Sequence, residues 1–286
     1  MVHLSFAVDL RYDVGSPNAD FIFNLQAART RCQHVLEESL AINQHVAVRS
    51  YEDPVTRTRI FRLNAVQGPL LVTYRAKVEI DHFVSNPSAV FEIPVTELPD
   101  EVLPYLYPSR YCQSDRFATL AMAEFGLLPR GYQRVEAIQG WVRRRVNFQK
   151  KSSTSVTSAI ETFDQSSGVC RDFAHLMIAL CRALSIPARY TTGIDYGADP
   201  ALGPTDFHAY VEVYLSHRWF IFDPAGVAIP MGFVRLGTGR DAADASFATI
   251  FGDVTPQLPM IQIGASRDPA RRWELPVHRS EALSTD

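Results

Sequence analysis

The sequence predicts an α+β protein: an all-β, sandwich-like amino-terminal domain followed by a domain in which helices pack on an antiparallel sheet. Three observations support this fold class. Residues 4–92 contain short segments rich in Val, Ile, Thr, Tyr and Phe, separated by turn residues. Prolines at positions 94, 99, 104 and 108 then interrupt the chain, and beyond them the apolar spacing becomes helical. We therefore expect one domain over residues 1–105 and a second over residues 106–286, the latter with a carboxy-terminal extension.

The composition is typical of a soluble globular protein and limits the classes of partner. Of 286 residues, 47% are hydrophobic and 21% are charged, which is enough for a sizeable core. Lys and Arg number 28 against 31 Asp and Glu, so the formal net charge is only −3. No long run of one sign occurs, and we expect neither nucleic acid nor a membrane as partner.

The start of the chain and its cysteines indicate a reducing compartment. The apolar run after Met1 is too short for a secretory signal, and Asp9 falls inside it. No run of about 18 apolar residues, as a membrane-spanning helix needs, is present. The cysteines are too scattered for a disulfide framework or a CxxC-type zinc site: Cys32, Cys112, Cys170 and Cys181. We therefore expect a cytoplasmic protein without a cofactor or a metal.

In the amino-terminal domain, strand-like segments alternate with turns. Gly15-Ser16-Pro17 and Gln67-Gly68-Pro69 are typical of turns and are expected to end strands. Four histidines of this region are isolated in the sequence, and we expect structural or surface roles for them: His3, His34, His45 and His82. The strand candidates are residues 4–14, 19–25, 46–49, 60–66 and 70–83.

The second domain begins with two predicted helices, over residues 116–125 and 133–148. In the second helix a spacing of three and four residues defines a buried face, formed by Val135, Ile138, Val142 and Val146. The opposite side carries three consecutive arginines, which we expect mostly to face water: Arg143, Arg144 and Arg145.

The stretch from Gly168 to Tyr190 contains a cysteine at the start of a predicted helix that is followed by a predicted strand. A glycine loop delivers Cys170 to the start of an amphipathic helix, and Ile186-Pro187 ends that helix before a strand over residues 188–194. Free N–H groups at a helix start favour negative charge, and hence a thiolate. The alternative is that Cys170 is a small core residue, as we expect for Cys181. The predicted inward face of the helix is formed by Cys170, Ala174, Met177, Ile178 and Cys181.

A β-hairpin is predicted after this helix. Residues 207–215 alternate strictly between apolar and polar, Ser216-His217-Arg218 turns the chain, and residues 219–223 return. If Leu215 pairs with Arg218, His208 is a diagonal neighbour of Asp223 on one face of the sheet.

A shift of the pairing by two residues would instead bring His208 directly opposite Asp223, still on the same face. In either register the carboxylate can orient the imidazole and stabilise its protonated form. The alternative is a polar pair at a strand end without a catalytic role.

The order Cys170, His208, Asp223 resembles that of the transglutaminase-like superfamily, in which a papain-like Cys-His-Asp triad is built from one helix and neighbouring antiparallel strands. The β-rich start and Tyr107-Pro108-Ser109-Arg110-Tyr111 are similar to the amino-terminal region of bacterial members. Over residues 135–225 the resemblance is specific and is carried, in order, by Gly168-Val169-Cys170-Arg171-Asp172-Phe173-Ala174, Ser185-Ile186-Pro187-Ala188-Arg189 and Asp206-Phe207-His208-Ala209-Tyr210.

This resemblance implies a cysteine protease or acyltransferase acting on a peptide or protein amide. Cys170 would be the nucleophile, His208 the base and Asp223 the orienting residue, with a thioester resolved by water or by an amine. The backbone N–H of Cys170 is the expected oxyanion donor. Trp141 is a candidate match for the upstream aromatic donor of animal transglutaminases.

Two departures favour hydrolysis over cross-linking. Arg171-Asp172 stands where animal transglutaminases have an aromatic pair, and no calcium-binding loop is evident. We therefore expect peptide or isopeptide hydrolysis first and transamidation second. The substrate itself is not predicted, although Tyr190, Asp195, Tyr196 and the loop over residues 193–204 are candidates to border the cleft.

Two other interpretations use the same residues. The first is a binding or scaffold protein that keeps the fold without turnover. The second is a metal site formed by Cys170, His208 and Asp223, which is disfavoured because the sequence supplies at most three ligands and no second cysteine pair.

Overall fold

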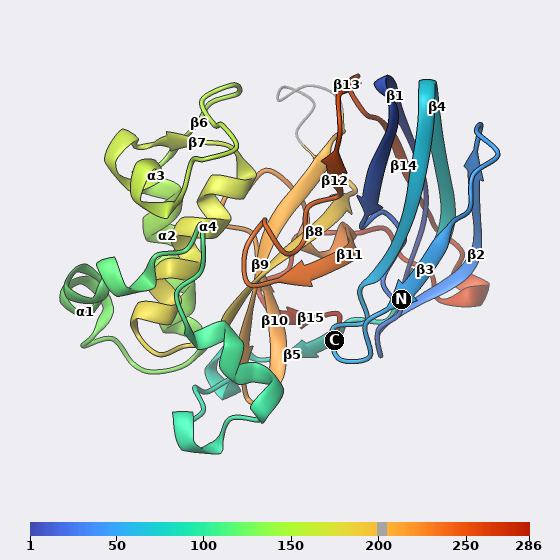
Figure 1. Ribbon diagram of the computed structural model, residues 1–286. Helices are drawn as coiled ribbons and strands as arrows, with labels where there is room; N and C mark the ends of the chain where they lie inside the picture. Colours follow the sequence, from blue (N-terminus) through green and yellow to red (C-terminus); the bar gives the residue numbers. More distant parts are fainter. Residues whose placement is uncertain (199–204) are drawn as a thin grey trace.

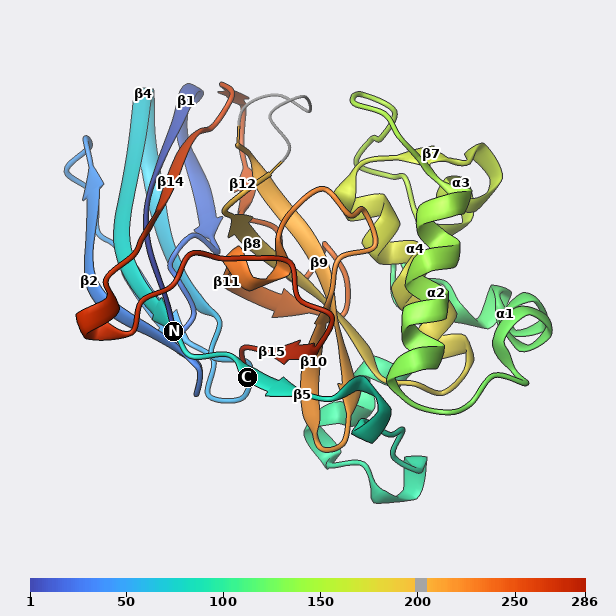
Figure 2. The same cartoon turned by 180° about the vertical axis from the view of Figure 1, so that it is seen from behind.

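The computed structural model consists of a helical layer, a four-stranded sheet and a seven-stranded sheet, stacked in that order (Figures 1 and 2). The structure describes residues 1–198 and 205–286. The two opposite views agree that helices α1 to α4 lie on one side of the four-stranded sheet and the larger sheet on the other. The α+β fold with a β-rich amino-terminal part is therefore confirmed.

The seven-stranded sheet is built on two 22-residue strands, β1 (Val2–Phe23) and β4 (Arg59–Ile80), which pair along their length. The two turn-like tripeptides do not end strands. Asp13 pairs with Pro69 and Val14 with Gly68, so the two interruptions lie opposite each other, where the register shifts between Val14 and Asn18. β2 (Gln33–Ile42) and β3 (Arg49–Glu52) pair with β4.

The other edge of β1 is covered by strands from the end of the chain. β12 (Ala248–Phe251), β13 (Val254–Pro256) and β14 (Met260–Ser266) each pair with β1. The first sheet is therefore not confined to residues 1–105, because part of the predicted carboxy-terminal extension belongs to it. The second layer of the predicted sandwich is the four-stranded sheet, since Ile194 and Val234 share a core with β1 and β4.

The four-stranded sheet has the order β10-β9-β8-β11 and is antiparallel throughout. Its strands are β8 (Ala188–Asp195), β9 (Phe207–Leu215), β10 (Arg218–Phe222) and β11 (Phe233–Gly239). Almost every residue in them is buried, because helices cover one face and the larger sheet the other.

The central helix α4 (Cys170–Ala183) is surrounded by protein rather than half-exposed. Residues Asp172 to Arg182 are all buried, because α4 packs against the sheet as well as against α1 (Ala118–Phe125), α2 (Tyr132–Arg145) and α3 (Ala159–Gln165). Only Cys170 and Arg171 at its start and Ala183 at its end are partly exposed. The remaining short elements are β5 (Phe83–Ser85), β6 (Asn147–Phe148), β7 (Ser167–Gly168), β15 (Ala282–Ser284) and the 3-10 helices η1 (Pro87–Ala89), η2 (Val95–Glu97), η3 (Asp100–Leu106), η4 (Ser114–Arg116), η6 (Pro230–Gly232) and η7 (Pro269–Arg271).

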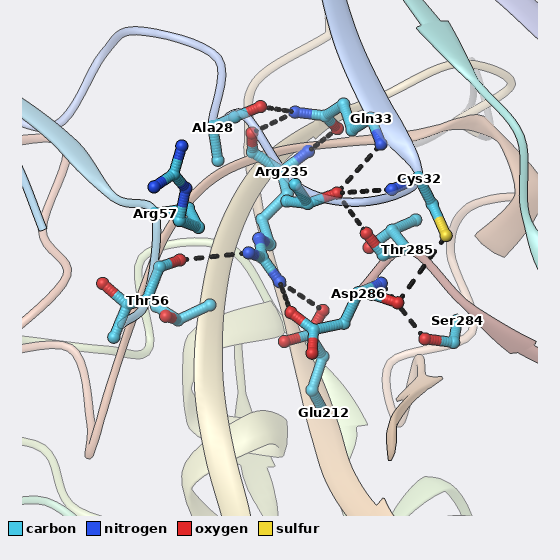
Figure 3. Close-up of polar contacts among 12 residues, drawn as sticks. Ala28, Cys32, Gln33, Thr56, Arg57, Glu212, Arg235, Ser284, Thr285 and Asp286 are labelled. Carbon is cyan, nitrogen blue, oxygen red and sulfur yellow. Dashed lines mark hydrogen bonds and ion pairs between the residues drawn. The ribbon is translucent and has the colours of Figure 1, made fainter. Parts of the chain in front are cut away.

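A buried ion cluster lies in the four-stranded sheet and contacts the loop that precedes β4 of the larger sheet (Figure 3). The guanidinium of Arg235 on β11 lies 3.5 Å from Glu212 on β9, 3.2 Å from the Asp286 side chain and 3.0 Å from the carbonyl of Thr56. Arg189 donates to the same Glu212 at 2.6 Å. Arg235 and Glu212 are both completely buried, so their charges are compensated by each other and by Arg189 and Asp286 rather than by water. Within the described residues, no helix is long and apolar enough to cross a membrane.

Candidate active site

Cys170 is the first residue of α4 and is partly exposed, as a nucleophile must be. Gly168 allows the chain to enter the helix here, because a Cβ at this position would lie 2.7 Å from the Cβ of Asp172. The carboxylate of the buried Asp172 accepts hydrogen bonds from the Val169 backbone N–H at 2.9 Å and from Ser153 at 2.9 Å. This cap fixes the first turn and leaves the N–H of Cys170, at the first helical position, without an intrahelical acceptor.

The β9–β10 hairpin brings His208 and Asp223 together in the first of the two predicted registers. Arg218 pairs with Leu215, and the two turn residues, Ser216 and His217, have φ values of 45° and 59°, as a type I′ turn requires. Continuing this ladder sets His208 diagonal to Asp223, and the distance from His208 Nε2 to Asp223 Oδ1 is 3.2 Å.

The carboxylate of Asp223 is held in place by the loop that follows it. Oδ1 accepts from the Ala225 N–H at 3.1 Å, and Oδ2 accepts from Val227 at 3.1 Å and from Ala228 at 3.3 Å. On the other side, Arg143 of α2 donates to the Asp223 backbone carbonyl. Asp223 is 3% exposed, so this buried carboxylate is oriented by several donors and its geometry does not depend on the imidazole alone.

The site favours a protonated His208. Burial opposes the charge, but the carboxylate of Asp223 and interaction with Cys170 outweigh it and raise the pKa of His208 well above its ordinary value. For Asp223, burial is likewise outweighed by the charge and hydrogen bond of His208, and its pKa is lowered. Because Nε2 is directed at Asp223, Nδ1 is the nitrogen left for the hydrogen bond with the Cys170 side chain.

A second carboxylate lies at this imidazole. Asp195 Oδ2 is 3.7 Å from His208 Nδ1, and the Asp195 side chain is 4% exposed. Burial raises the pKa of Asp195, nearby Asp223 adds to this effect, and His208 counteracts it. The sequence placed Asp195 only at the border of the cleft. Its proximity to His208 results from strand pairing between β8 and β9, for which the local sequence carries no signal.

Other residues considered from the sequence have different environments. Trp141 is not directed at the cysteine: its ring packs against Phe125 at 6.0 Å and Phe163 at 6.2 Å between centroids. Cys181 is completely buried, as expected for a core residue. The three consecutive arginines at the end of α2 are exposed as predicted, although Arg143 also donates to the Asp223 carbonyl. Residues 199–204 of the predicted cleft loop lie outside the described residues.

The buried His175 has a structural environment. Its Nε2 accepts from the Ala242 N–H at 3.2 Å, and its ring stacks between Tyr111 and Tyr190. Burial lowers the pKa of His175 well below its ordinary value, which keeps it neutral. Among the described residues, no group of three or more His, Cys, Asp or Glu side chains has an arrangement suited to a metal ion.

Comparison with protein families gives two matches, one in each half of the chain. Residues 124–224 match the model of the transglutaminase-like superfamily, and residues 2–101 match that of the bacterial transglutaminase N-terminal domain. The first match contains Cys170, His208 and Asp223.

Individual relatives are similar over different lengths. A crystal structure described as a "putative cysteine protease" from Cytophaga hutchinsonii is 38% identical, with a TM-score of 0.91 over 100% of this chain and 98% of that one. An uncharacterized protein of Mycobacterium leprae is 30% identical over 39% of this chain and 42% of its own length. An uncharacterized protein of Mycobacterium tuberculosis is 31% identical over 34% of each chain. The matches thus span less than half of the two mycobacterial proteins.

Proposed function

The chain belongs to the transglutaminase-like superfamily, and on this premise we propose that it is a cysteine-dependent acyl-transfer enzyme whose catalytic residues are Cys170, His208 and Asp223. The observation that supports this proposal is the His208–Asp223 contact of 3.2 Å beside a partly exposed cysteine at a helix start. The reaction class is attack on an amide carbonyl, with peptide or isopeptide hydrolysis as the first expectation and transamidation as the second.

The proposed first half-reaction forms a thioester. The imidazolium of His208 stabilises the Cys170 thiolate, and the sulfur attacks the carbonyl carbon of the amide. The negative charge that develops on the carbonyl oxygen is stabilised by the backbone N–H of Cys170. The C–N bond then breaks, and the leaving amine takes its proton from His208 Nδ1. Asp223 keeps the ring oriented throughout through Nε2.

The second half-reaction releases the acyl group. His208, now neutral, accepts a proton from water or from an amine at Nδ1, and the resulting nucleophile attacks the thioester carbonyl. The C–S bond breaks and Cys170 returns to a thiolate beside an imidazolium. Water gives hydrolysis and an amine gives transamidation; the arrangement of the three residues is compatible with both.

Alkylation by iodoacetamide tests the reactive pair without a known substrate. We expect Cys170 to be alkylated at pH 5–6, where an ordinary thiol is almost unreactive, and this reactivity to be lost in His208→Ala. Cys32, which is also partly buried, is an internal control. Burial raises the pKa of Cys32, so it should react slowly at every pH used. Equal rates for Cys170 and Cys32, or no effect of His208→Ala, would contradict the proposal.

Turnover is tested in a cell extract by detecting the Cys170 adduct and by adding a fluorescent primary amine. Cys170 should form a covalent thioester with extract peptides, detectable by mass spectrometry, and Cys170→Ala should abolish it. A fluorescent primary amine added to the same reaction distinguishes the outcomes: incorporation into protein indicates transamidation, and release of new amino or carboxyl termini without incorporation indicates hydrolysis. The absence of any Cys170 adduct and of either product would favour a non-catalytic protein.

A further inference from the structure

The imidazole of His208 lies between two carboxylates contributed by the strands on either side of β9. Tyr210 is the residue whose ladder position faces Asp223, and Gly193 on β8 pairs directly with His208. Because side chains two residues apart share a face, Asp195 is diagonal to His208 from β8 just as Asp223 is from β10. The two carboxylates are displaced in opposite directions along β9, and so they meet different nitrogens of the ring.

The contact distances give the two carboxylates different roles. Asp223 lies 3.2 Å from Nε2, within hydrogen-bond range, whereas Asp195 lies 3.7 Å from Nδ1, which is ion-pair range but long for a hydrogen bond. The Nδ1 hydrogen therefore remains available to the Cys170 sulfur. Among the described residues, the ring stacked on His208, at 5.3 Å between centroids, is the uncharged ring of Phe233.

From this geometry, and resting on the function proposed above, we propose that Asp195 is a positioning residue for His208, holding the imidazolium by charge from the Nδ1 side while leaving the Nδ1 hydrogen to Cys170. The orientation and the protonation of His208 beside Cys170 then depend on two carboxylates rather than one. Asp223 fixes the orientation of the ring, and Asp195 extends the protonated state of the ring to higher pH.

The titratable groups that the structure describes around the ring come from three elements. Cys170 faces His208 from α4, Asp195 from β8 and Asp223 from the end of β10, and β11 contributes the uncharged Phe233. Asp206, at the start of β9, is exposed and acts on Asp195 only by its charge. An anionic Asp195 stabilises the imidazolium but repels the thiolate, so its removal should favour loss of the His208 proton and also favour the thiolate.

The test is the pH profile of Cys170 alkylation by iodoacetamide, read by peptide mapping, in wild type, Asp195→Asn and Asp206→Asn. The upper inflection, where His208 loses its proton, should move down by on the order of one pH unit in Asp195→Asn. The acid inflection should move down or stay, since a neutral residue no longer opposes the thiolate. In Asp206→Asn, which removes an equal charge without the contact, both inflections should stay in place.

A merely structural role gives a different profile. If Asp195→Asn only loosened the site, the pair would weaken, and the acid inflection would move up while the upper one moved down. A narrower pH range of Cys170 alkylation on both sides, or an upper inflection that does not move, overturns the proposal. An upper inflection restored toward the wild-type value in Asp195→Glu supports it.

An NMR measurement tests the proposal if the variant does not fold, and the alkylation results separate this proposal from the proposed function. If Asp195→Asn does not fold, the carboxyl carbon of Asp195 in ¹³C-aspartate-labelled wild type is followed by NMR: it should shift at the pH where His208 titrates, and no shift overturns the proposal. If wild-type Cys170 shows no acid-side reactivity and His208→Ala changes nothing, the proposed function fails, and this inference with it. Acid-side reactivity that His208→Ala removes and Asp195→Asn leaves unchanged overturns this inference alone.

Discussion

Arg143 on α2 donates a hydrogen bond of 2.7 Å from its Nη2 to the backbone carbonyl of Asp223. The contact connects the helical layer to the residue whose carboxylate contacts His208. Asp223 is therefore held from two directions, by Arg143 at its main chain and by the loop N–H groups at its carboxylate.

Replacing Arg143 with Ala should slow the alkylation of Cys170 without unfolding the protein. Loss of a single charge-assisted hydrogen bond of about 1–2 kcal/mol corresponds to roughly a five- to thirtyfold effect if it is expressed fully at the site. The measurement is the rate of Cys170 alkylation at pH 6. Arg144→Ala, at the next exposed position of the same helix, is the matched control and should leave this rate unchanged. Equal effects of the two substitutions would indicate a role of surface charge only.

Asp223→Asn should have a larger effect than Arg143→Ala. The amide keeps the size of the side chain but removes the charge that, against burial, raises the pKa of His208. We expect at least about a hundredfold loss of acid-side alkylation, because an amide can also stabilise the wrong tautomer of the ring. Alkylation of Cys32 should be unchanged in the same sample. Retention of wild-type reactivity at Cys170 would exclude an orienting role for Asp223.

The contribution of His208 to stability should depend on pH in a defined direction. Its folded-state pKa is raised, so its stabilisation is fully present below the unfolded value of about 6.5 and is lost as pH rises through the folded value. The pKa of Asp223 is lowered, so its contribution is lost at acidic pH, below about 4. The free energy of unfolding in urea, wild type minus His208→Gln, should therefore be largest near pH 5–6 and decrease above it. A difference that is constant from pH 5 to pH 10 would contradict the assignment.

Gly168→Ala should disrupt the start of α4. A Cβ at this position would lie 2.7 Å from the Asp172 Cβ and 3.1 Å from its carboxylate, so the cap on Val169 would be displaced at a cost of about 1–3 kcal/mol. Both the midpoint of urea unfolding and the reactivity of Cys170 should fall. Gly140→Ala, inside α2, is the contrasting control: its Cβ would meet only the flexible end of Arg144 at 3.2 Å, and the better helix former should stabilise the protein by up to about 1 kcal/mol.

The charges of the buried ion cluster around Arg235 should be strongly coupled. Arg235→Met alone leaves the completely buried Glu212 with one fewer counter-ion and should cost on the order of 3–5 kcal/mol. Combining it with Glu212→Gln should recover part of this cost, because the buried carboxylate that has lost one of its two counter-ions is then neutral. The free energies of unfolding of the two single variants and the double variant form the required cycle. Additive losses would show that the pair does not act as a unit.

The candidate site could be predicted from the sequence largely because its parts follow local rules. A glycine before a helix start located Cys170, and the period of two in a strand sets His208 and Asp223 on one face in either odd register. The choice between those registers was made by the turn at Ser216 and His217. Asp195 was not assigned a role, because its contact depends on which strand lies beside β9.

The amino-terminal sheet was less predictable for related reasons. Its β-rich character was evident, but Gly68 and Pro69 were expected to end a strand, whereas pairing with β1 carries β4 through them. β2 was missed because Leu36 and Leu40, separated by acidic residues, have a helical spacing; pairing with β4 overrides this local preference. No local signal indicated that residues 248–266 return to β1.

This return has a consequence for the order in which the protein folds during synthesis. β1 leaves the ribosome early, but the strands that cover its second edge, β12 to β14, follow more than two hundred residues later. At ordinary elongation rates the nascent chain waits on the order of tens of seconds with an unpaired edge. Such an edge is a template for pairing with other chains, so the first sheet of this protein is the part most dependent on dilution or chaperones until synthesis passes Ser266.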